Sequence, residues 1–448
     1  MIKQIAQNKK KLLHELNLII IGLAIFALSP IFKINLIVPT LLLILSIYLK
    51  LTTPNLKNKT YNLLNTSLLF VIIFSTSYII IQKQLSIFYI PFSLIPMLAI
   101  ILFDNLNVTM LLVLASSIAI ASIAKNNYLV AVFFLVNGIL AALLAKGVRR
   151  RSVIIRTGLI IGISQVITLF LIEQFTIHNP ANYMTLFLNG IACGLLATGI
   201  LPVFEYLFKT VTNISLLELA DFNHPLLQRM IIEAPGTYHH SLIVGNLSEA
   251  ACKAVGANSL LARIGAYYHD IGKLTKPDYF SENQTENESR HDNLAPGMSK
   301  LIIMSHVKEG VELAKKYHLN SSIINFIEQH HGDSLVYYFY RRALENLEVN
   351  EEVEEEGFRY PGPKPETKET AIVLLSDSVE AAARSLKDPN PQKIEELVHK
   401  IINNKFIDGQ LDECDLTLKE IEKISAVFIR ILTGIYHGRI TYPEKSSS

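Results

Sequence analysis

The sequence predicts an all-α protein in two parts: a polytopic transmembrane helix bundle over residues 1–208 and a soluble helical domain over residues 209–448. Half of the 448 residues are hydrophobic and only 18% are charged, against roughly 25% charged in an ordinary soluble protein. The first part holds 15 Lys/Arg and 4 Asp/Glu, the second 26 and 35. Because the second part also holds 11 of the 13 histidines, this division indicates a membrane part joined to a soluble part.

Eight apolar runs in the first part are long enough to cross a membrane, which takes about 20 mostly apolar residues. They cover approximately residues 16–32, 34–50, 63–82, 86–103, 108–124, 128–145, 153–173 and 182–207. The second run follows the first almost at once, which favours an uncleaved first span over a signal peptide. No charged residue lies deep within the first seven runs, so an anchor or sensor bundle is favoured over a transport path.

The basic residues predict how the bundle is oriented. The strongest clusters are Lys9–Lys11, Lys50 with Lys57 and Lys59, and Lys146 with Arg149–Arg151. With eight spans these clusters fall on one side of the membrane, and the C-terminal domain shares that side. The excess of Lys and Arg on cytoplasmic loops assigns this side to the cytoplasm.

The second part is expected to be an all-α bundle, because apolar residues recur at helical spacing and no convincing alternating strand occurs. The expected helices are Ser215–Ala220, Leu242–Val255, Leu260–Tyr268, Ser299–His318, Ser321–His331, Thr370–Leu386, Pro391–Asn403 and Leu416–Tyr436. The polar stretch Pro277–Pro296 lacks periodicity and is expected to be a loop. The acidic residues after Glu345 are expected to be solvated, and the proline run ending at Pro365 a rigid connector.

Seven His and Asp residues of the second part are candidate metal ligands. Most follow an apolar helical run, and polar residues at the ends of such runs can converge on the core of a bundle. Neutral imidazole and carboxylate suit iron, manganese and similar divalent metals. A lone His–Asp pair carries little weight, as His291–Asp292 in the polar loop illustrates, so the joint pattern carries the prediction. The seven are His240, His269, Asp270, His306, His330, His331 and Asp377.

These residues resemble a known signature. His240, His269–Asp270 and Asp377 match the H…HD…D pattern of the HD phosphohydrolase superfamily, and the remaining three histidines match its two-metal branch. The surrounding sequence is similar to the seven-transmembrane HD phosphohydrolase family of PgpH type over nearly all of residues 209–440. The matching stretches are EAPGTYHHS from Glu233, GAYYHDIGK from Gly265, SHVKEG from Ser305, QHHG from Gln329, FRYPGPKP from Phe358 and SDSVEAA from Ser376. The membrane part resembles that family in span number and order only.

The chain departs from that family in one respect. Members typically carry an extracellular domain between the first span and the remaining seven. Here the first two runs are joined directly through Phe32–Lys33–Ile34, which implies that this domain is absent. Without that domain, sensing of an extracellular ligand would be in doubt, while the catalytic half is unaffected.

The resemblance implies a membrane-anchored phosphodiesterase that hydrolyses cyclic di-AMP, a bacterial second messenger, to linear pApA with two divalent metal ions, manganese or iron. By the same resemblance Asp270 bridges both metals. The site of one metal would be completed by His240, His269 and Asp377, and the site of the other by His306, His330 and His331.

Two basic residues are candidates for phosphate binding. Lys273 lies one helical turn past Asp270, and Arg384 lies two turns past Asp377. Each position also fits an ordinary surface residue.

The implied location is the bacterial cytoplasmic membrane, with the HD domain in the cytoplasm. The expected partners are the cyclic dinucleotide substrate and the lipid bilayer, with no nucleic acid polymer. Homo-oligomerisation is left open.

Three other functions stay open. HD-GYP proteins cut cyclic di-GMP with similar ligands, but no Gly-Tyr-Pro element occurs in the second part of this chain. Other nucleotides, such as pppGpp or dNTPs, are a second alternative. The third is a receptor that binds a nucleotide without cutting it. A missing ligand residue would favour the receptor, and all seven positions are filled here.

Overall fold

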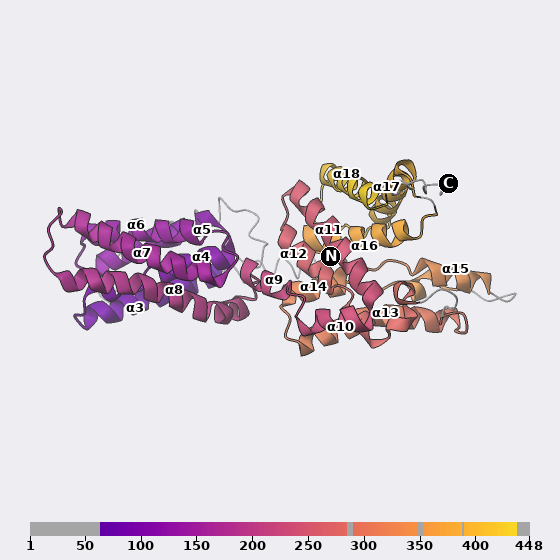
Figure 1. Ribbon diagram of the computed structural model, residues 1–448, viewed down its shortest axis with the longest axis horizontal. Helices are drawn as coiled ribbons and strands as arrows, with labels where there is room; N and C mark the ends of the chain where they lie inside the picture. Colours follow the sequence, from indigo (N-terminus) through magenta and orange to yellow (C-terminus); the bar gives the residue numbers. More distant parts are fainter. Residues whose placement is uncertain (1–62, 285–289, 347–352, 388, 437–448) are drawn as a thin grey trace, which may run out of the picture. The chain divides into compact units, whose positions relative to one another are not determined.

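A computed structural model describes residues 63–284, 290–346, 353–387 and 389–436. Within these residues the chain forms helices and turns, with no β-strand beyond an isolated bridge between Leu335 and Arg359. The all-α prediction is confirmed. The chain divides into two compact units, Met1–Ile214 and Ser215–Ser448 (Figure 1). The boundary expected after residue 208 lies at the end of helix α8, six residues before the boundary between these units.

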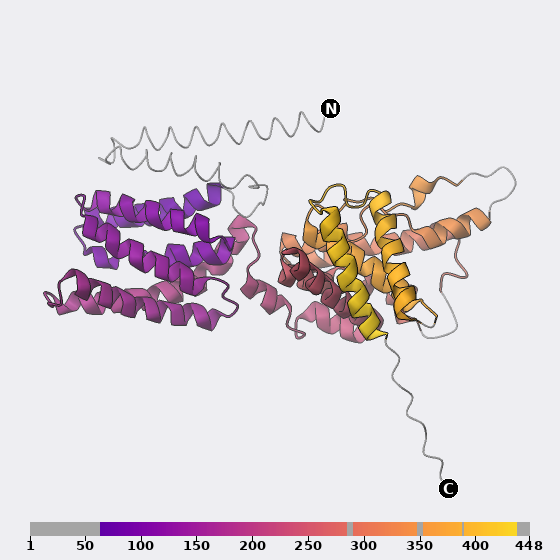
Figure 2. The same cartoon turned by 90° about the horizontal axis from the view of Figure 1, so that it is seen from above.

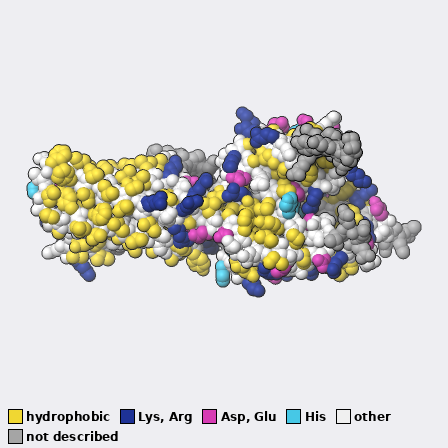
Figure 3. Space-filling model, in the orientation of Figure 1, with side chains coloured by type: hydrophobic (Ala, Val, Ile, Leu, Met, Phe, Trp, Pro, Cys, Tyr) yellow, Lys and Arg dark blue, Asp and Glu magenta, His cyan; other side chains and the backbone are white. Residues whose placement is uncertain are grey.

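The first unit contains five described helices that are long and apolar enough to cross a membrane. They are α3 (Leu63–Gln82), α5 (Leu106–Ile123), α6 (Tyr128–Ala145), α7 (Arg151–Ile172) and α8 (Pro180–Phe208). Eighteen helical residues reach about 27 Å, close to the thickness of the hydrocarbon core. Hydrophobic side chains cover most of the visible surface of this unit (Figure 3). The first two predicted runs lie in residues 1–62, outside the described residues.

The fourth predicted run, 86–103, is interrupted, which corrects the expectation of one unbroken span. A 3-10 turn, η2 (Ile87–Tyr89), precedes helix α4 (Leu94–Phe103), and Pro91 between them has no amide hydrogen to continue a helix. The Asn189 side chain donates to the carbonyls of Phe88 and Ile90, at 3.2 Å each. These bonds satisfy carbonyls that the interruption exposes, which a membrane interior requires. Nearly all of α4 is buried, as expected of a helix that is apolar on every side.

Helices α7 and α8 pack through glycines. A Cβ atom built on Gly190 would lie 2.2 Å from the backbone nitrogen of Gly162, and one on Gly158 would lie 2.7 Å from the carbonyl oxygen of Gly190. No other residue permits this approach. Small residues at a helix crossing are typical of membrane bundles, where close packing replaces the hydrophobic effect as the driving force.

Helix α9 (Asn213–Leu219) lies at the boundary of the two units, and the second unit is built mainly from short and medium helices. They are α10 (Pro225–Glu233), α11 (Pro235–Val255), α12 (Ser259–Tyr268), α13 (Pro296–Lys316), α14 (Ser321–Gln329), α15 (Tyr337–Glu345), α16 (Lys368–Arg384), α17 (Pro391–Ile407) and α18 (Leu418–Ile435). The sequence did not predict α10 and α15. Each has only nine residues, which is shorter than the window over which helical periodicity is recognised.

Helix α16 is the centre of the second unit. Its residues from Thr370 to Asp377 are all buried, and it packs against α11, α12, α14, α17 and α18. Figure 2 shows α17 and α18 side by side. The core is made of apolar residues such as Val244, Leu374 and Phe428. A central helix that carries Asp377 among its buried residues brings a carboxylate into the interior, where it requires a cationic partner.

Candidate metal centre

Two helices of the second unit end at the candidate ligands. His269 is the last, capping residue of α12, and His330 holds the same position on α14. At a helix end the last carbonyls have no partner within the helix. The Nδ1 atom of His269 therefore donates to the carbonyl of Ala266 at 2.6 Å, and that of His330 to the carbonyl of Ile327 at 2.9 Å. These bonds leave the Nε2 atom of each ring available as a ligand.

Three other candidates lie inside helices. His240 is on α11, His306 on α13 and Asp377 on α16, and they are 3%, 1% and 7% exposed. The expected helix Leu242–Val255 begins earlier, at Pro235, so His240 lies within the helix and not before it. Proline favours the first helical turn because its missing amide hydrogen is not needed there.

The structure brings all seven candidates together in two groups. One group contains His240, His269, Asp270 and Asp377, and the other contains His306, His330 and His331. Within each group, one potential ligand atom per residue lies within 4.8 Å of all the others. The donor set of imidazoles and carboxylates suits a divalent transition metal.

Asp270 belongs to the first group and also faces the second. Its Oδ2 atom is 3.2 Å from Nε2 of His269 and 3.7 Å from Nε2 of His240. Its Oδ1 atom is 3.4 Å from Nε2 of His306 and 3.6 Å from Nε2 of His330. One carboxylate therefore presents one oxygen to each group, which is the arrangement that a bridging ligand requires.

Two buried ligand atoms, Nε2 of His269 and Oδ1 of Asp270, have no hydrogen-bond partner among the described residues. The other carboxylate oxygen of Asp270, Oδ2, is paired with the ammonium of Lys273 at 2.7 Å. Leaving buried polar atoms unpaired in a protein interior is costly, and a bound cation would satisfy both. The residues present therefore fit a metal site on the chemistry of their donor atoms.

The charges of the centre shift the pKa values of its members. Burial alone would lower the pKa of His269, but Asp270 and Asp377 beside it raise the value to about 10. Burial would raise the pKa of Asp270, yet His269 and Lys273 hold it well below its usual range. Burial lowers the pKa of His306 to about 4. The negative field that favours a proton on His269 also favours a metal cation there.

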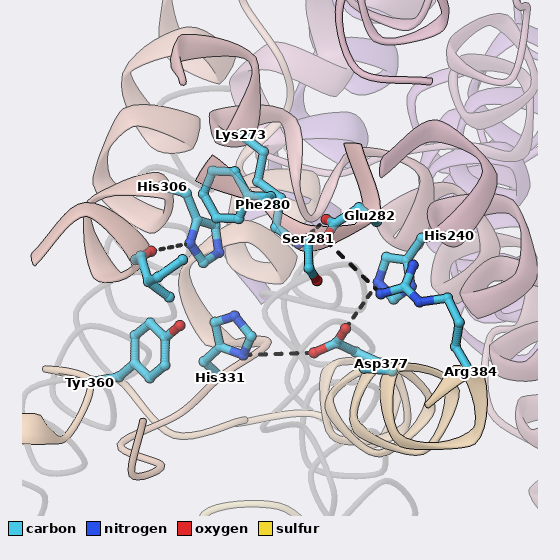
Figure 4. A pocket seen from close by; sticks show the side chains of 12 residues that line it. His240, Lys273, Phe280, Ser281, Glu282, His306, His331, Tyr360, Asp377 and Arg384 are labelled. Carbon is cyan, nitrogen blue, oxygen red and sulfur yellow. Dashed lines mark hydrogen bonds and ion pairs between the residues drawn. The ribbon is translucent and has the colours of Figure 1, made fainter. Parts of the chain in front are cut away.

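The centre opens into a cavity of about 210 Å³ (Figure 4). Lys273 and Arg384, the two basic residues singled out in the sequence, both line it. The Nζ atom of Lys273 is 2.7 Å from Oδ2 of Asp270, and these charges raise its pKa against the opposing effect of burial. Arg384 is the last residue of α16 and is 40% exposed in its side chain.

Sequence reasoning missed three residues of the centre. Glu380 accepts a hydrogen bond from Nδ1 of His240, and its spacing of three from Asp377 could have indicated a shared helix face. The ring of Tyr360 stacks on that of His331 with centroids 4.3 Å apart. Glu282 lies 2.7 Å from the ammonium of Lys273. Tyr360 lies in the FRYPGPKP stretch, which stands out in the sequence without indicating a role for this residue, whereas Glu282 belongs to no such stretch and follows no periodic pattern.

The second His–Asp pair stays outside the centre. His291 is buried, and its Nε2 atom interacts with the carbonyl of Tyr279 at 2.8 Å. Arg342 on α15 donates to the carbonyls of His291 and Asp292, at 3.2 Å each. The pair connects the loop to α15, and neither residue belongs to the metal-ligand groups of the described residues.

Two family models match the chain. One, described as a 7TM receptor with intracellular HD hydrolase, covers residues 28–212, and the HD domain model covers residues 237–382. The HD domain implies dependence on divalent metal ions, and the two ligand groups are compatible with it. The apolar helices and the first model together make the chain a membrane protein.

The chain is also similar to two curated proteins that share one name. The chain is 47% identical over 324 residues to the "Cyclic-di-AMP phosphodiesterase PgpH" of Bacillus subtilis (strain 168), covering 71% of this chain and 45% of the relative. It is 45% identical over 321 residues to the protein of the same name from Listeria monocytogenes serotype 1/2a (strain 10403S), covering 70% of this chain and 44% of the relative. The chain thus spans less than half the length of these relatives.

Solved structures extend the comparison to the second unit. The crystal structure of the L. monocytogenes phosphodiesterase PgpH HD domain is 51% identical, covers 48% of this chain and 100% of its own, and has a TM-score of 0.46. The same domain in complex with cyclic di-AMP is 50% identical over the same shares, with a TM-score of 0.47. From the matched membrane and HD models and these relatives, the chain belongs to the PgpH-type family of seven-transmembrane receptors with an intracellular HD hydrolase.

Proposed function

We propose that this protein is a membrane-anchored, metal-dependent phosphodiesterase that hydrolyses cyclic di-AMP to pApA. The observation that carries the proposal is the position of Asp270, with one oxygen toward each of two ligand groups. A pair of metals bound by one bridging carboxylate is suited to phosphodiester hydrolysis. The names of the two PgpH relatives support the choice of substrate.

The two groups would hold two divalent metal ions, manganese or iron. His240, His269 and Asp377 would complete one site, and His306, His330 and His331 the other, with Asp270 shared between them. When bound, such metals lower the pKa of a bridging water and stabilise the departing oxygen. Proteins favour imidazole and carboxylate for both manganese and iron, so the donor atoms fit either.

The basic residues of the cavity would receive the phosphate. The ammonium of Lys273 and the guanidinium of Arg384 both line the cavity, and each can donate charge-assisted hydrogen bonds to a phosphate oxygen. Such donors stabilise the negative charge that accumulates on phosphorus oxygens during attack by water. Cleavage of the bond to the 3′ oxygen leaves a 3′ hydroxyl and a 5′ phosphate, which is the pattern of pApA.

Residues 1–208 would serve as the membrane anchor and residues 209–448 as the catalytic domain in the cytoplasm of a bacterial cell. The basic clusters at the ends of the apolar runs, including Lys146 to Arg151, support this orientation. A cytoplasmic catalytic domain would meet a cytoplasmic second messenger directly. The lipid bilayer and the cyclic dinucleotide are then the expected partners.

The test uses the full chain purified in detergent and loaded with Mn²⁺ or Fe²⁺. Cyclic di-AMP and cyclic di-GMP are supplied side by side, and the products are separated by chromatography. Selective formation of pApA is the expected result. Cleavage of cyclic di-GMP with equal or higher kcat/KM would overturn the substrate assignment. Tight binding of either nucleotide without product would indicate a receptor in place of an enzyme.

A further inference from the structure

Gly236 and Thr237 belong to the EAPGTYHHS stretch and lie in the first turn of helix α11, which begins at Pro235. The short turn η5 (Ser281–Asn283) packs directly on them. The backbone nitrogen of Thr237 donates to Oδ1 of Asn283 at 3.1 Å, and Nδ2 of Asn283 donates to Oγ1 of Thr237 at 2.9 Å. A Cβ atom on Gly236 would lie 1.8 Å from the carbonyl oxygen of Glu282. Only glycine allows the turn to approach this closely.

This packing places Glu282 in the wall of the cavity (Figure 4). Its side chain is 6% exposed, and the Thr237 hydroxyl donates to its Oε1 atom at 3.2 Å. The same Oε1 atom is 2.7 Å from the ammonium of Lys273. Its other oxygen, Oε2, is 4.0 Å from a guanidinium nitrogen of Arg384. One carboxylate therefore faces two cations that come from different helical elements.

We propose that Glu282 is a positioning residue that fixes Lys273 and Arg384 around a common site for a substrate phosphate. The inference rests on the proposed function and deepens it. Lys273 lies on η3 (Ile271–Thr275) and Arg384 at the end of α16. Among the described residues, no other acidic side chain forms ion pairs with both. The carboxylate of Glu282 therefore holds the ammonium of Lys273 and the guanidinium of Arg384 near each other.

The surroundings of Lys273 explain why a second carboxylate is needed. The oxygen of its first partner, Oδ2 of Asp270, also faces His269 and His240, so that carboxylate is shared with the metal ligands. Glu282 has no such second duty and can hold the ammonium in the cavity. The ring of Phe280 covers another side of the ammonium, with its centroid 5.0 Å away. An ammonium has three donors, so two ion pairs leave one donor for a phosphate oxygen.

The test replaces Glu282 by glutamine, which keeps the shape and removes the charge. The full chain in detergent is loaded with Mn²⁺ and assayed with cyclic di-AMP and with bis(p-nitrophenyl) phosphate, a phosphodiester without bases. For E282Q we expect KM to rise about tenfold for both, as for a lost charged hydrogen bond, with kcat changed less than about threefold. Metal content should stay at the wild-type level. The matched control is E309Q, since Glu309 pairs with Lys276 outside the cavity and its removal should leave KM unchanged.

The role of Glu282 can also be tested with a variant of Thr237 and by measuring phosphate binding. T237V removes the hydroxyl that donates to Glu282 and accepts from Asn283, and should also raise KM, even if E282Q folds poorly. Calorimetry with inorganic phosphate on the metal-free protein should show weaker binding by E282Q than by wild type. An unchanged or lowered KM in both variants, or a loss of bound metal in E282Q, would overturn the positioning role.

Failure of the proposed function has a different signature. Wild-type protein that cleaves bis(p-nitrophenyl) phosphate but not cyclic di-AMP would refute the assignment of cyclic di-AMP as the substrate. The KM of E282Q for the simple diester, compared with that of wild type, would still decide the role of Glu282. Wild-type protein that cleaves neither compound would refute the proposed phosphodiesterase activity. The comparison of phosphate binding between wild type and E282Q then decides whether Glu282 positions the two cations. Equal phosphate binding by wild type and E282Q would count against it.

Discussion

The Nε2 atoms of His306 and His330 lie 3.1 Å apart in the buried centre. The Nδ1 atom of each ring faces a backbone carbonyl of the preceding turn, at 2.5 Å from Ile303 and 2.9 Å from Ile327. Both Nε2 atoms then present lone pairs to each other, because a neutral imidazole carries only one N–H. Burial lowers the pKa of His306 to about 4, which disfavours a shared proton. A metal cation resolves this contact best.

Replacing His306 by alanine should remove one of the two metals. We expect metal analysis by mass spectrometry to fall from two ions per chain toward one, and hydrolysis of cyclic di-AMP to fall at least about a hundredfold, since both ions contribute to such a reaction. The control is H399Q, a histidine of α17 outside the ligand groups. Two ions per chain in H306A would contradict the assignment of this group.

Chelation should lower the stability of the wild-type protein. Ligand that binds only the folded state adds about 2.7 kcal/mol per site when it is present at 100 times Kd. The melting temperature of the full chain in detergent should therefore fall on treatment with EDTA and recover with Mn²⁺. H306A should respond less than wild type. Equal melting temperatures with and without metal would argue against any metal bound by this fold.

Replacing Asp270 by asparagine should abolish hydrolysis while the chain stays in the membrane fraction. Asparagine keeps the shape of the side chain but offers only one oxygen, so it is unable to serve both groups. We expect activity to fall at least about a thousandfold, with metal content also reduced. The measurement is the rate of pApA formation, normalised to protein in the membrane fraction. Retained activity in D270N would contradict a mechanism in which Asp270 bridges two metals.

Replacing Glu380 by glutamine should weaken metal binding without removing a metal ligand. Glu380 accepts from Nδ1 of His240, which leaves Nε2 of that ring toward the metal ligands. Loss of such an outer partner typically lowers metal affinity or activity by about 10- to 100-fold. A competition titration with a fluorescent chelator measures this affinity. E396Q, on an exposed part of α17, serves as the control and should bind metal like wild type.

Glu420 should make stability depend on pH in the acidic range. Hydrogen bonds from the ammonium of Lys368 and the backbone of Thr417 lower the pKa of Glu420 from 4.5 to about 2. A carboxyl with a lowered pKa stabilises the folded state fully above pH 4.5, and this contribution is lost as the pH falls toward 2. The melting temperature of wild type should therefore exceed that of E420Q at pH 6, and the gap should narrow between pH 4.5 and pH 3. E422Q, an exposed neighbour on α18, should show no such trend.

Replacing Gly190 by alanine should destabilise the membrane unit. The added Cβ atom would meet the backbone of Gly162 at 2.2 Å, which forces α7 and α8 apart. Overpacking of this kind typically costs about 1–3 kcal/mol. Thermal unfolding in detergent measures the loss. Gly199→Ala on the same helix is the control, because nothing lies within 4 Å of a Cβ atom there.

The sequence by itself determined the helical class, the membrane character and the seven candidate ligands. Membrane spans follow from the length of apolar runs, which is a local property, so the helices at 63–82, 106–123 and 128–145 could be located closely. The candidate ligands could be located because each belongs to a short stretch whose residue types and order are specific. Pro91 was visible too, yet the apolar composition around it outweighed the proline and concealed the interruption before α4.

Only the tertiary structure decided how these residues face one another. The two oxygens of Asp270 point to different histidine groups because α12 ends where α13 and α14 pack, which no spacing along the chain encodes. Glu282 reaches Lys273 because a turn lies against Gly236, a contact between residues about 45 positions apart. Contacts between distant segments depend on the packing of whole helices, and they fix the position of a charge far more finely than a sequence pattern does.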